Sequence, residues 1–379
     1  MSSSTDALNA MSTSSRDTMS SLSSLGRQSR PNNTEKKIGR VYLDATTSSV
    51  PYPLPIDLTE THRQIIFGQL MDMIYDTPIL SSELMNKPPL RVLELGCDTG
   101  WWSATCHQYF EARGHHIEFV GMDIKAPIGI EGPYRQLGMD FEYVQHDLNQ
   151  APWPFEDEGF DLIMARNIAL ALDPRKYSAV VLEYGRLLKP GGTLEIWEHD
   201  FTVRSMRPKI QDHAGDLEPL GLYPVLDNAA FGPATDPYIT QLNTWITAGF
   251  AELLLPTLPC SYIQSMFSGR LVEGSEVFDI ADVKRVAIPL NLESAVWETG
   301  TGKVPRMLNN DQMVIRRTAL ENFIEMIEAL EPFVRSASGK SQSAWDAWLS
   351  KAKWNWLKND GFAFGECLEL GAWSVKKNR

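Results

Sequence analysis

The feature that most constrains the fold is the stretch Arg91-Val-Leu-Glu-Leu-Gly-Cys-Asp-Thr-Gly100. It is typical of a short apolar strand, followed by a glycine-bearing turn and a helix that begins at Trp101-Trp102. Because glycine has no Cβ, Gly96 and Gly100 can adopt backbone angles that other residues avoid, and they let a ligand approach the bare backbone. The amides of the turn and of the helix N-terminus would then point at that ligand.

Four more apolar segments of strand character follow, at 117–123, 141–148, 160–167 and 187–197. Asp123 ends the first of them, about twenty residues beyond the glycines, where nucleotide-binding α/β folds place a ribose-binding carboxylate. Asp147 stands at the end of the second. Strands that alternate with helical stretches favour a parallel, doubly wound sheet.

These motifs, in this order, resemble those of class I S-adenosylmethionine-dependent methyltransferases. The matching residues are Glu-Leu-Gly-Cys-Asp-Thr-Gly, Asp123, His146-Asp147-Leu148, Phe160-Asp-Leu-Ile and Leu-Lys-Pro-Gly-Gly, spread over roughly 90–200. The resemblance implies an α/β fold with a Rossmann-like seven-stranded sheet, helices on both faces, helical insertions that form a substrate cap, and S-adenosyl-L-methionine as cofactor. One departure is Asp98, which replaces the middle glycine of the family's Gly-x-Gly-x-Gly turn.

A segment ahead of the glycine turn makes the resemblance narrower. Tyr-Pro-Leu-Pro-x-Asp, followed by an acid and an arginine, is similar to the fungal LaeA-like methyltransferases, which are class I enzymes associated with secondary metabolism and its regulation. The matching positions are Tyr52, Pro53, Leu54, Pro55, Asp57, Glu60 and Arg63. Pro152-Trp-Pro-Phe, Arg166-Asn167 and Glu-Ile-Trp-Glu-His-Asp200 also fit that group.

The composition limits the classes of partner. The 379 residues suffice for one large elaborated domain or two domains. A net charge of −13 argues against a broad nucleic-acid or anionic-membrane footprint. The four cysteines lack CxxC or zinc spacing, so we expect no metal and a reduced compartment, the cytoplasm, with the nucleus as alternative. No apolar run is long enough to span a bilayer, and no secretory signal pattern is present.

We divide the chain into four parts. Residues 1–37 form a Ser-rich tail that we expect to be disordered. Residues 38–89 form an extension with a helix at 58–76, capped by Asp57 or Thr59, that either packs on the sheet edge or covers the cofactor cleft with Tyr42 or Tyr52 reaching in. Residues 90–200 form the S-adenosylmethionine-binding core, and 201–379 form the cap and the last two strands.

Within 201–379, the pattern predicts a long loop at 201–235 and leaves 258–276 ambiguous. It predicts helices at 236–255, 313–334 and 341–357, and strands at 281–291 and 366–376. The tryptophans of the last helix are typical of a core stripe rather than a ligand box. By the resemblance, the last strand would lie antiparallel between the fifth and sixth strands.

The resemblance assigns roles to the motif residues. Gly96 and Gly100 would face the amino-acid part and ribose of the cofactor, and Asp123 would accept hydrogen bonds from the ribose hydroxyls. Asp147 would lie by the adenine amino group. The complete expected cofactor-binding set is Glu94, Gly96, Cys97, Gly100, Trp101, Asp123, Ile124, His146, Asp147, Leu148, Arg166 and Asn167.

Each role has a structural alternative. Asp123 and Asp147 would cap the helices after their strands, Arg166 would be an ion-pair partner, and Glu94 would order the glycine turn instead of binding the cofactor's ammonium group. His199, ahead of His62, His146 and His213, is the best-placed general base for a hydroxyl acceptor. An amine acceptor would need no base.

We expect helices of 201–280 and 300–358 to form the acceptor pocket, with Trp245, Phe231 and Phe267 as lining.

Two functions of different class follow. The first is transfer of a methyl group to an oxygen or nitrogen atom of a small-molecule metabolite, a secondary metabolite in the narrower case. The alternative is a cofactor-binding regulatory protein that acts through protein partners, with the Ser-rich tail as contact. A deep, closed acceptor pocket favours the enzyme, and an open cleft with an exposed apolar patch favours the regulator. An NAD-binding Rossmann domain fits poorly because Gly-x-Gly-x-x-Gly spacing is missing.

Overall fold

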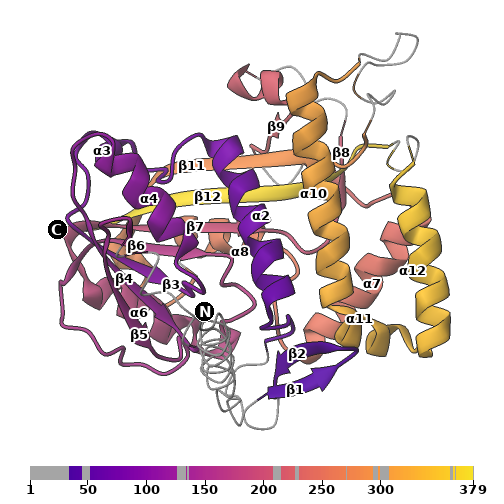
Figure 1. Ribbon diagram of the computed structural model, residues 1–379, viewed down its shortest axis with the longest axis horizontal. Coiled ribbons are helices and arrows are strands. Elements are labelled where there is room, and N and C mark those ends of the chain that lie inside the picture. Colours follow the sequence, from indigo (N-terminus) through magenta and orange to yellow (C-terminus); the bar gives the residue numbers. More distant parts are fainter. Residues whose placement is uncertain are drawn as a thin grey trace, which may run out of the picture.

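The parallel sheet expected from the sequence is the centre of the protein, described here from a computed structural model (Figure 1). The structure describes residues 34–44, 52–125, 134, 136–207, 215–226, 230–269, 271–292, 298, 307–358, 362 and 364–378. The expected tail therefore lies outside the described residues up to position 33. Its last part, Thr34–Lys37 (β1), is a strand instead, and it pairs with Arg40–Leu43 (β2).

Seven long strands form the core of the sheet, in the order β5-β4-β3-β6-β7-β12-β11. Their bounds are Arg91–Leu95 (β3), Glu118–Asp123 (β4), Asp140–Gln145 (β5), Phe160–Arg166 (β6), Leu188–His199 (β7), Phe278–Pro289 (β11) and Glu366–Lys377 (β12). The first five run parallel, and β12 lies antiparallel between β7 and β11. The predicted class I sheet, including its reversed last strand, is confirmed.

The segment 201–235, predicted as a long loop, adds short strands to this sheet. Arg204–Met206 (β8) pairs with β12 and with Phe231–Gly232 (β10), and Tyr223–Pro224 (β9) pairs with β11. A short 3-10 helix, Gly215–Leu220 (η3), lies between them. The sheet thus has ten strands, and the loop prediction is wrong. The long strands β11 and β12 offer backbone partners that a Pro- and Gly-rich segment can use over two or three residues, a length too short to give a periodic signal.

The helices cover both faces of the sheet, and side chains along each strand alternate between them. Val92, Leu162 and Met164 pack on the face of α2 and α4, whereas Leu93 and Ile163 pack on the face of α6 and α8. The helices are Leu58–Tyr75 (α2), Ser82–Asn86 (α3), Trp101–Glu111 (α4), Tyr177–Leu187 (α6), Pro237–Glu252 (α7), Pro259–Ser268 (α8), Asn310–Ala329 (α10), Glu331–Ser338 (α11) and Gln342–Trp356 (α12), with short 3-10 helices at Pro174–Lys176 (η1) and Ser275–Val277 (η5).

One predicted helix is two. The stretch 313–334 breaks at Leu330, and α11 begins one residue later with Pro332 in its first turn. Proline lacks the amide proton that would continue α10 and its ring clashes with the carbonyl four residues earlier, so a new helix starts there. The start of α10 is fixed by a capping box between Asn309 and Gln312.

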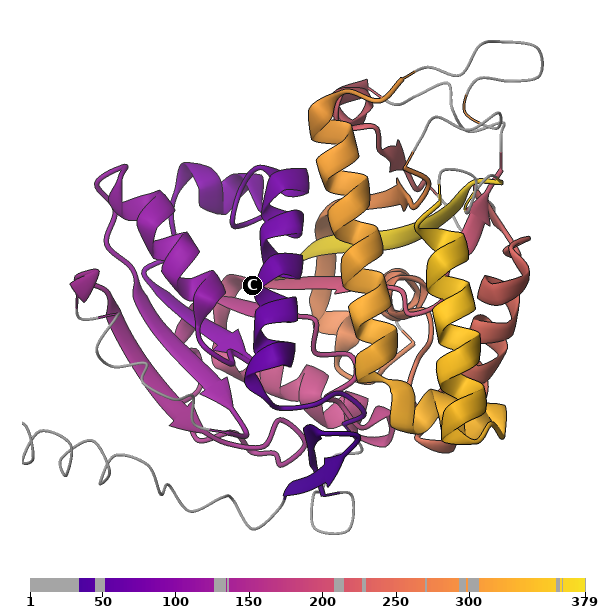
Figure 2. The same ribbon diagram turned by 45° about the vertical axis from the view of Figure 1, so that its right-hand side comes forward.

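Helices α7, α10, α11 and α12 gather beside the sheet, on the right in Figures 1 and 2. Trp345 and Trp356 are fully buried there and Trp348 nearly so, which confirms the core interpretation of the stripe, whereas Trp354 is 68% exposed. Helix α2 runs between this group and the sheet (Figure 1). Arg63 of α2 joins the two, since it donates to Glu60 at 3.0 Å and to Asn322 of α10 at 2.9 Å.

Candidate functional site

A cavity of about 410 Å³ lies at the edge of the sheet where β4, β5 and β6 end. This volume is within the range of small-molecule sites, roughly 300–1,000 Å³. One wall comes from described residues within 41–64, and the other from described residues within 96–171. The lining residues are Val41, Leu43, Tyr52, Pro55, Ile56, Asp57, Leu58, Glu60, Thr61, Gln64, Gly96, Asp98, Thr99, Asp123, Ile124, Lys125, Asp147, Leu148, Arg166, Asn167, Ile168 and Ala171.

The glycine turn after β3 is part of the wall formed by residues within 96–171. Gly96 has φ +61°, and a Cβ there would lie 2.9 Å from Ile168 Cγ2. Gly100 has φ +66° at the N-terminus of α4, and a Cβ there would lie 3.1 Å from the Phe141 ring. Asp98, which replaces the usual glycine, also adopts a positive φ, +42°. Asp tolerates this region better than most residues, so the turn keeps its left-handed course.

Asp123 holds this turn in place from the end of β4. Its Oδ2 accepts the Asp98 amide at 2.9 Å, and its Oδ1 accepts the Lys125 amide at 3.2 Å. Burial raises the pKa of Asp123 to about 6. The second bond is the local cap that the structural alternative predicted, although residues 126–133, where a following helix would begin, lie outside the described residues. Asp123 and the adjacent Ile124 nevertheless line the cavity.

The segment after β5 brings two of its three predicted residues to the cavity. Asp147 and Leu148 line it. The Asp147 Oδ1 also accepts the Asn149 amide at 2.9 Å, but this bond closes a turn, because β6 and not a helix follows β5, and the predicted helix cap is wrong. His146 is not among the lining residues, and its Nε2 lies 2.7 Å from the Gln150 carbonyl.

Arg166 and Asn167, at the end of β6, both line the cavity. The Arg166 side chain is 7% exposed, and its Nη2 lies 3.6 Å from Asp72 Oδ1. Its Nη1 is buried without a hydrogen-bond partner among the described residues, and burial lowers the pKa of the group. The expected ion pair exists but is long, and it leaves a donor open beside the cavity. An open guanidinium donor is suited to a carboxylate or another anionic group.

Four residues of the predicted set are placed close to the turn but off the cavity lining: Glu94, Cys97, Gly100 and Trp101. Glu94 accepts the Ser103 hydroxyl at 2.6 Å and burial raises its pKa to about 7, so it orders the glycine turn against α4. The Cys97 sulfur packs against Gly121, and the Trp101 ring packs against Gly68 of α2.

The set of site residues predicted from the sequence did not include most of the wall at 41–64. Tyr52, Glu60, Thr61 and Gln64 supply its polar groups, and the Tyr52 hydroxyl accepts from Gln64 Nε2 at 3.3 Å. Of the two tyrosines considered, Tyr52 reaches the cavity, whereas Tyr42 is buried and donates to the Ala329 carbonyl. The only signal was the Tyr-Pro-Leu-Pro-x-Asp match, since an extended, Pro-rich segment shows no periodicity that would place it.

Polar contacts hold this wall against the rest of the site. Asp57 caps α2, which resolves the choice between Asp57 and Thr59, and its carboxylate also pairs with Arg40 at 2.8 Å. Arg40 and two backbone donors hold the pKa of Asp57 at about 2 despite an opposing effect of burial. Lys125, just after β4, donates to the Ile56 carbonyl at 2.8 Å. The wall at 41–64 is thereby tied to the strand ends.

His199, the predicted general base, is not part of the cavity lining. It ends β7 with 5% exposure, and its Nδ1 lies 3.3 Å from Asn167 Oδ1. Its ring contacts Phe67 edge-on and Phe201 in a tilted arrangement. Burial lowers its pKa to about 3, so the imidazole is neutral at physiological pH. It contacts a lining residue, Asn167, but the structure does not bring it to the cavity itself.

The predicted acceptor pocket from residues after 200 is wrong for this cavity, because every lining residue lies between 41 and 171. Trp245 packs against Trp348 and Phe267 against Phe278, and Arg204 lies over the Phe231 ring. These aromatic residues fill cores of the helical group and the sheet edge. The sequence gives the periodicity of such residues but not which apolar face meets which.

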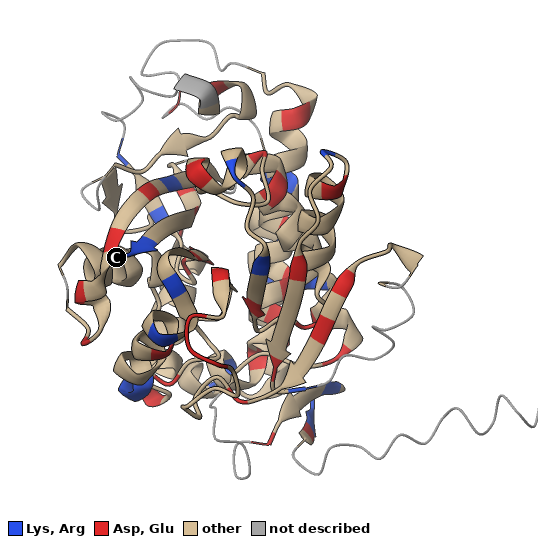
Figure 3. Ribbon diagram, turned by 90° about the vertical axis from the view of Figure 1, so that its left-hand side faces the viewer, with Lys and Arg blue, Asp and Glu red and all other residues tan. Residues whose placement is uncertain are grey.

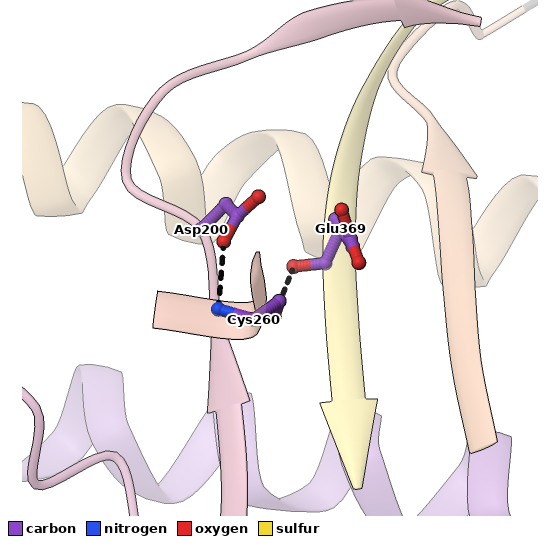
Figure 4. Close-up of side chains that lie close together, drawn as sticks. All are labelled: Asp200, Cys260 and Glu369. Carbon is purple, nitrogen blue, oxygen red and sulfur yellow. Dashed lines mark hydrogen bonds between the residues drawn. The ribbon is translucent and has the colours of Figure 1, made fainter. Parts of the chain in front are cut away.

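Three further residues meet deep in the protein, and they are drawn in Figure 4: Asp200, Cys260 and Glu369. Their ligand atoms lie within 4.8 Å of one another, as metal ligands would. However, Arg204 donates to both carboxylates, Arg285 donates to Glu369 at 2.7 Å and the Cys260 amide donates to Asp200 at 3.1 Å. Each of the four carboxylate oxygens already has a protein donor, so the cluster is a buried ion-pair network.

Charges of both signs are dispersed over the side of the protein shown in Figure 3. The edge strand β5 carries two acidic residues, Asp140 and Glu142. Carboxylates on an edge strand disfavour pairing with other chains. None of the described helices combines the length and the apolar character that crossing a membrane requires.

Comparisons with known proteins find similarity in the same part of the chain. Residues 92–192 match the family model described as a methyltransferase domain. An uncharacterised protein of Haemophilus influenzae is 30% identical over 104 residues, which are 27% of this chain and 40% of that protein. The secondary metabolism regulator laeA of Coprinopsis cinerea is 27% identical over 160 residues, 40% of this chain and 36% of that protein. The chain thus spans well under half the length of the curated relatives it matches.

Among solved structures, the crystal structure of the [4+2]-cyclase SpnF is 16% identical to this chain. It covers 84% of this chain and 82% of its own, with a TM-score of 0.39. The matched segment 92–192 runs from β3 into β7 and carries the glycine turn, Asp123, Asp147, Arg166 and Asn167. By the match to the family model, residues 92–192 form a methyltransferase domain, and the cofactor is S-adenosyl-L-methionine.

Proposed function

We propose that the protein is an S-adenosylmethionine-dependent methyltransferase that transfers the methyl group to an oxygen or nitrogen atom of a small-molecule metabolite. The observation that carries the proposal is the 410 Å³ cavity, because one of its walls is built from the residues of the methyltransferase motifs. A cavity of this size suits a nucleoside-sized cofactor and a small acceptor rather than a macromolecular surface.

The groups present fit the cofactor. Asp123 would accept the ribose hydroxyls, Asp147 would lie at the adenine, and the open Nη1 of Arg166 would take the amino-acid carboxylate. When bound, the cofactor supplies a methyl group already activated by its sulfonium. Arg40 and Arg63 pair with the lining acids Asp57 and Glu60. The other lining acids, Asp98, Asp123 and Asp147, still outnumber the lining cations, Lys125 and Arg166, which favours a ligand with positive charge.

The wall at 41–64 would then face the acceptor. Apolar Val41 and Leu43 would exclude water, while Tyr52 and Gln64 would orient the nucleophile. Burial raises the pKa of Tyr52 well above its usual value, so its hydroxyl acts as a hydrogen-bonding group and not as a base. A neutral amine needs no base, and a hydroxyl acceptor would need one of the lining carboxylates or the predicted His199.

The test is formation of S-adenosylhomocysteine from S-adenosylmethionine with a panel of small amines, phenols, alcohols and carboxylates. At least one acceptor should give turnover that Asp123→Ala abolishes. Gln64→Ala should raise KM for that acceptor about tenfold or more, the loss of one or two hydrogen bonds, while cofactor Kd stays unchanged. Gln69→Ala, on an exposed turn of the same helix, is the matched control. Turnover with no acceptor, despite cofactor binding, would reject the enzymatic proposal.

A second candidate is the cofactor-binding regulatory protein, which the partial likeness to the Coprinopsis cinerea regulator favours. Its protein partners would bind through the N-terminal tail, and the secondary-metabolism role would follow from that regulation. Its test compares wild type, Asp123→Ala and a chain lacking residues 1–33 in the source organism. If regulation needs the tail but survives Asp123→Ala, the regulatory candidate replaces the enzyme.

We also propose the cytoplasm as the site of action, with the nucleus as alternative. The four cysteines are free and buried, which suits a reducing compartment. Imaging of a fluorescent fusion distinguishes the two compartments, and a secreted fusion would reject both.

A further inference from the structure

A second cavity, separate in its chemistry from the first, lies between α6, α8 and the end of β7. Its volume is about 40 Å³, larger than the roughly 10–15 Å³ that one water occupies. Its walls are mostly aliphatic, with Val180, Val181, Ile263 and Met266 among them. Nearly all of its lining is buried, and Tyr262 on α8, 37% exposed, marks the outer side.

One ionisable acid lines this cavity, Glu198 of β7, which is 1% exposed. Its Oε1 accepts the Ala169 amide at 2.7 Å. Its Oε2 has no hydrogen-bond partner within the part of the chain that the structure describes. A buried polar atom without a partner is costly, and it is rare in folded proteins. The amides of Ile168 and His199 also lower the pKa of this carboxyl group, but Oε2 makes no hydrogen bond of normal geometry and can accept one from a ligand.

Glu195, three residues earlier on the same strand, provides an internal reference. Its two oxygens accept the amides of Leu80 and Ser81 at 2.8 and 2.7 Å, and the Trp197 indole at 3.0 Å. It is as deeply buried as Glu198, but its donors are all protein groups. Burial raises the pKa of Glu195 to about 7 and that of Glu198 to about 8, although protein donors oppose the shift in both.

The other polar side chains of the wall are three tyrosines, Tyr177, Tyr184 and Tyr262. The rings of Tyr177 and Tyr262 lie 5.1 Å apart at an angle of 38°. Aromatic faces attract organic cations, and aliphatic walls accept their alkyl groups. An inorganic cation is a poorer occupant, because one carboxylate among aliphatic and aromatic walls cannot replace a hydration shell.

We propose that this Glu198 cavity is a binding site for a small organic ammonium ion of the size of methylammonium. An N–H group of the ligand donates to Glu198 Oε2, and its alkyl part contacts the tyrosine rings and the aliphatic walls. A neutral amine reaches the same state by taking the proton of a neutral Glu198 carboxyl, so that an ammonium–carboxylate pair forms without other reactants. The site is independent of the proposed methyl transfer, and it shares only the wall residue Ile168 with the cofactor cavity.

The test is calorimetric titration of the full chain with methylammonium chloride at pH 8.5, with sodium chloride at equal ionic strength as the blank. We expect saturable binding with Kd of about 1 mM, the affinity of a single charged contact in a small site. Glu198→Gln should weaken it about tenfold or more, whereas Glu195→Gln should leave it within about twofold. Affinity should fall as pH is lowered through the pKa of Glu198.

Three results would overturn the proposal. They are no saturable heat with wild type, equal binding by wild type and Glu198→Gln, or an equal loss in Glu195→Gln. If the variants do not fold, wild type alone decides, with methanol as the neutral ligand of similar size and tetrapropylammonium as the oversized cation. Methylammonium should bind while neither of these does, and equal heats for methanol would show that the cavity holds only water or neutral molecules.

Discussion

Two clusters of buried charged residues in this molecule differ in whether all of their side-chain polar atoms have hydrogen-bond partners. Around Asp200 and Glu369, every carboxylate oxygen accepts a hydrogen bond from Arg204, Arg285 or Cys260. At the 410 Å³ cavity, Arg166 keeps a donor without a partner among the described residues. A complete network stabilises the fold, whereas an incomplete one beside a cavity is ready for a ligand. Titratable residues alone therefore do not identify a functional site, and an open hydrogen bond beside a cavity is the further observation that points to one.

The largest expected effect is on stability, at the complete network. Glu369→Ala leaves Arg204 and Arg285 buried without their shared partner, and it should lower the free energy of unfolding by about 3–5 kcal/mol. Urea unfolding followed by circular dichroism measures this loss. S-adenosylmethionine affinity of the folded fraction should stay unchanged. A variant that lost cofactor affinity but kept its stability would reverse the two roles.

At the incomplete cluster, Arg166→Met should affect binding rather than folding. Losing a charge-assisted hydrogen bond of about 1.5–3 kcal/mol weakens S-adenosylmethionine binding roughly 10- to 100-fold. Methylthioadenosine has no amino-acid carboxylate, so its affinity should change little. Competition titrations with both ligands test this. An equal loss for the two ligands would indicate that Arg166 supports the shape of the cavity and not the carboxylate.

Stability should also depend on pH through the buried acids. Burial raises the pKa values of Asp123, Glu94, Glu195 and Glu198 to about 6, 7, 7 and 8. Between their unfolded values and these, the folded chain holds more protons than the unfolded chain, so stability falls as pH rises. Above pH 6.5, His199, whose pKa burial lowers to about 3, no longer opposes this trend.

We therefore expect the free energy of unfolding to fall by up to about 4 kcal/mol between pH 6.5 and 8.5, about half of it through Glu198, since one pKa unit corresponds to about 1.4 kcal/mol. Thermal unfolding at several pH values measures it. Glu198→Gln should flatten the profile. A stability that rises over this interval would contradict the assignment of raised pKa values.

The smallest effect concerns the departure from the family's glycine pattern. Asp98→Gly places a glycine at φ +42°, which glycine adopts without steric cost. The free energy of unfolding should therefore rise by only about 0.5–1 kcal/mol or less. The Asp98 amide that bonds Asp123 is retained, so cofactor affinity should change less than about threefold. Calorimetry on this variant tests both. A large loss of affinity would show that the Asp98 carboxylate itself contacts the cofactor.

The sequence predicted the strand core well because its motifs are local. The glycine turn, Asp123 and Asp147 lie at strand ends, and parallel strands bring their carboxyl ends together without further information. The wall at 41–64 could not be placed in the same way. It depends on tertiary contacts, such as that of Lys125 with Ile56, that no periodicity records.

The region after 200 shows the same limit. Helix existence followed from periodicity, but the break at Leu330 required attention to Pro332, and the pairing of β8 with β12 rests on backbone alone. The acceptor role given to Trp245 failed because an aromatic stripe reports burial and not its partner, which proved to be Trp345 and Trp348. The sequence also did not predict the cluster of Asp200, Cys260 and Glu369, because these residues are far apart in the chain.

The most direct test of the account is calorimetric titration of S-adenosylmethionine and S-adenosylhomocysteine into wild type, Asp123→Ala and Asp140→Ala. Asp140 is an exposed acid on the neighbouring strand β5 and serves as matched control. We predict binding near the micromolar range, about −8 kcal/mol, for wild type and Asp140→Ala, and a loss of about tenfold or more for Asp123→Ala. No binding of either ligand to the folded wild type would contradict the assignment of the cavity as a cofactor site.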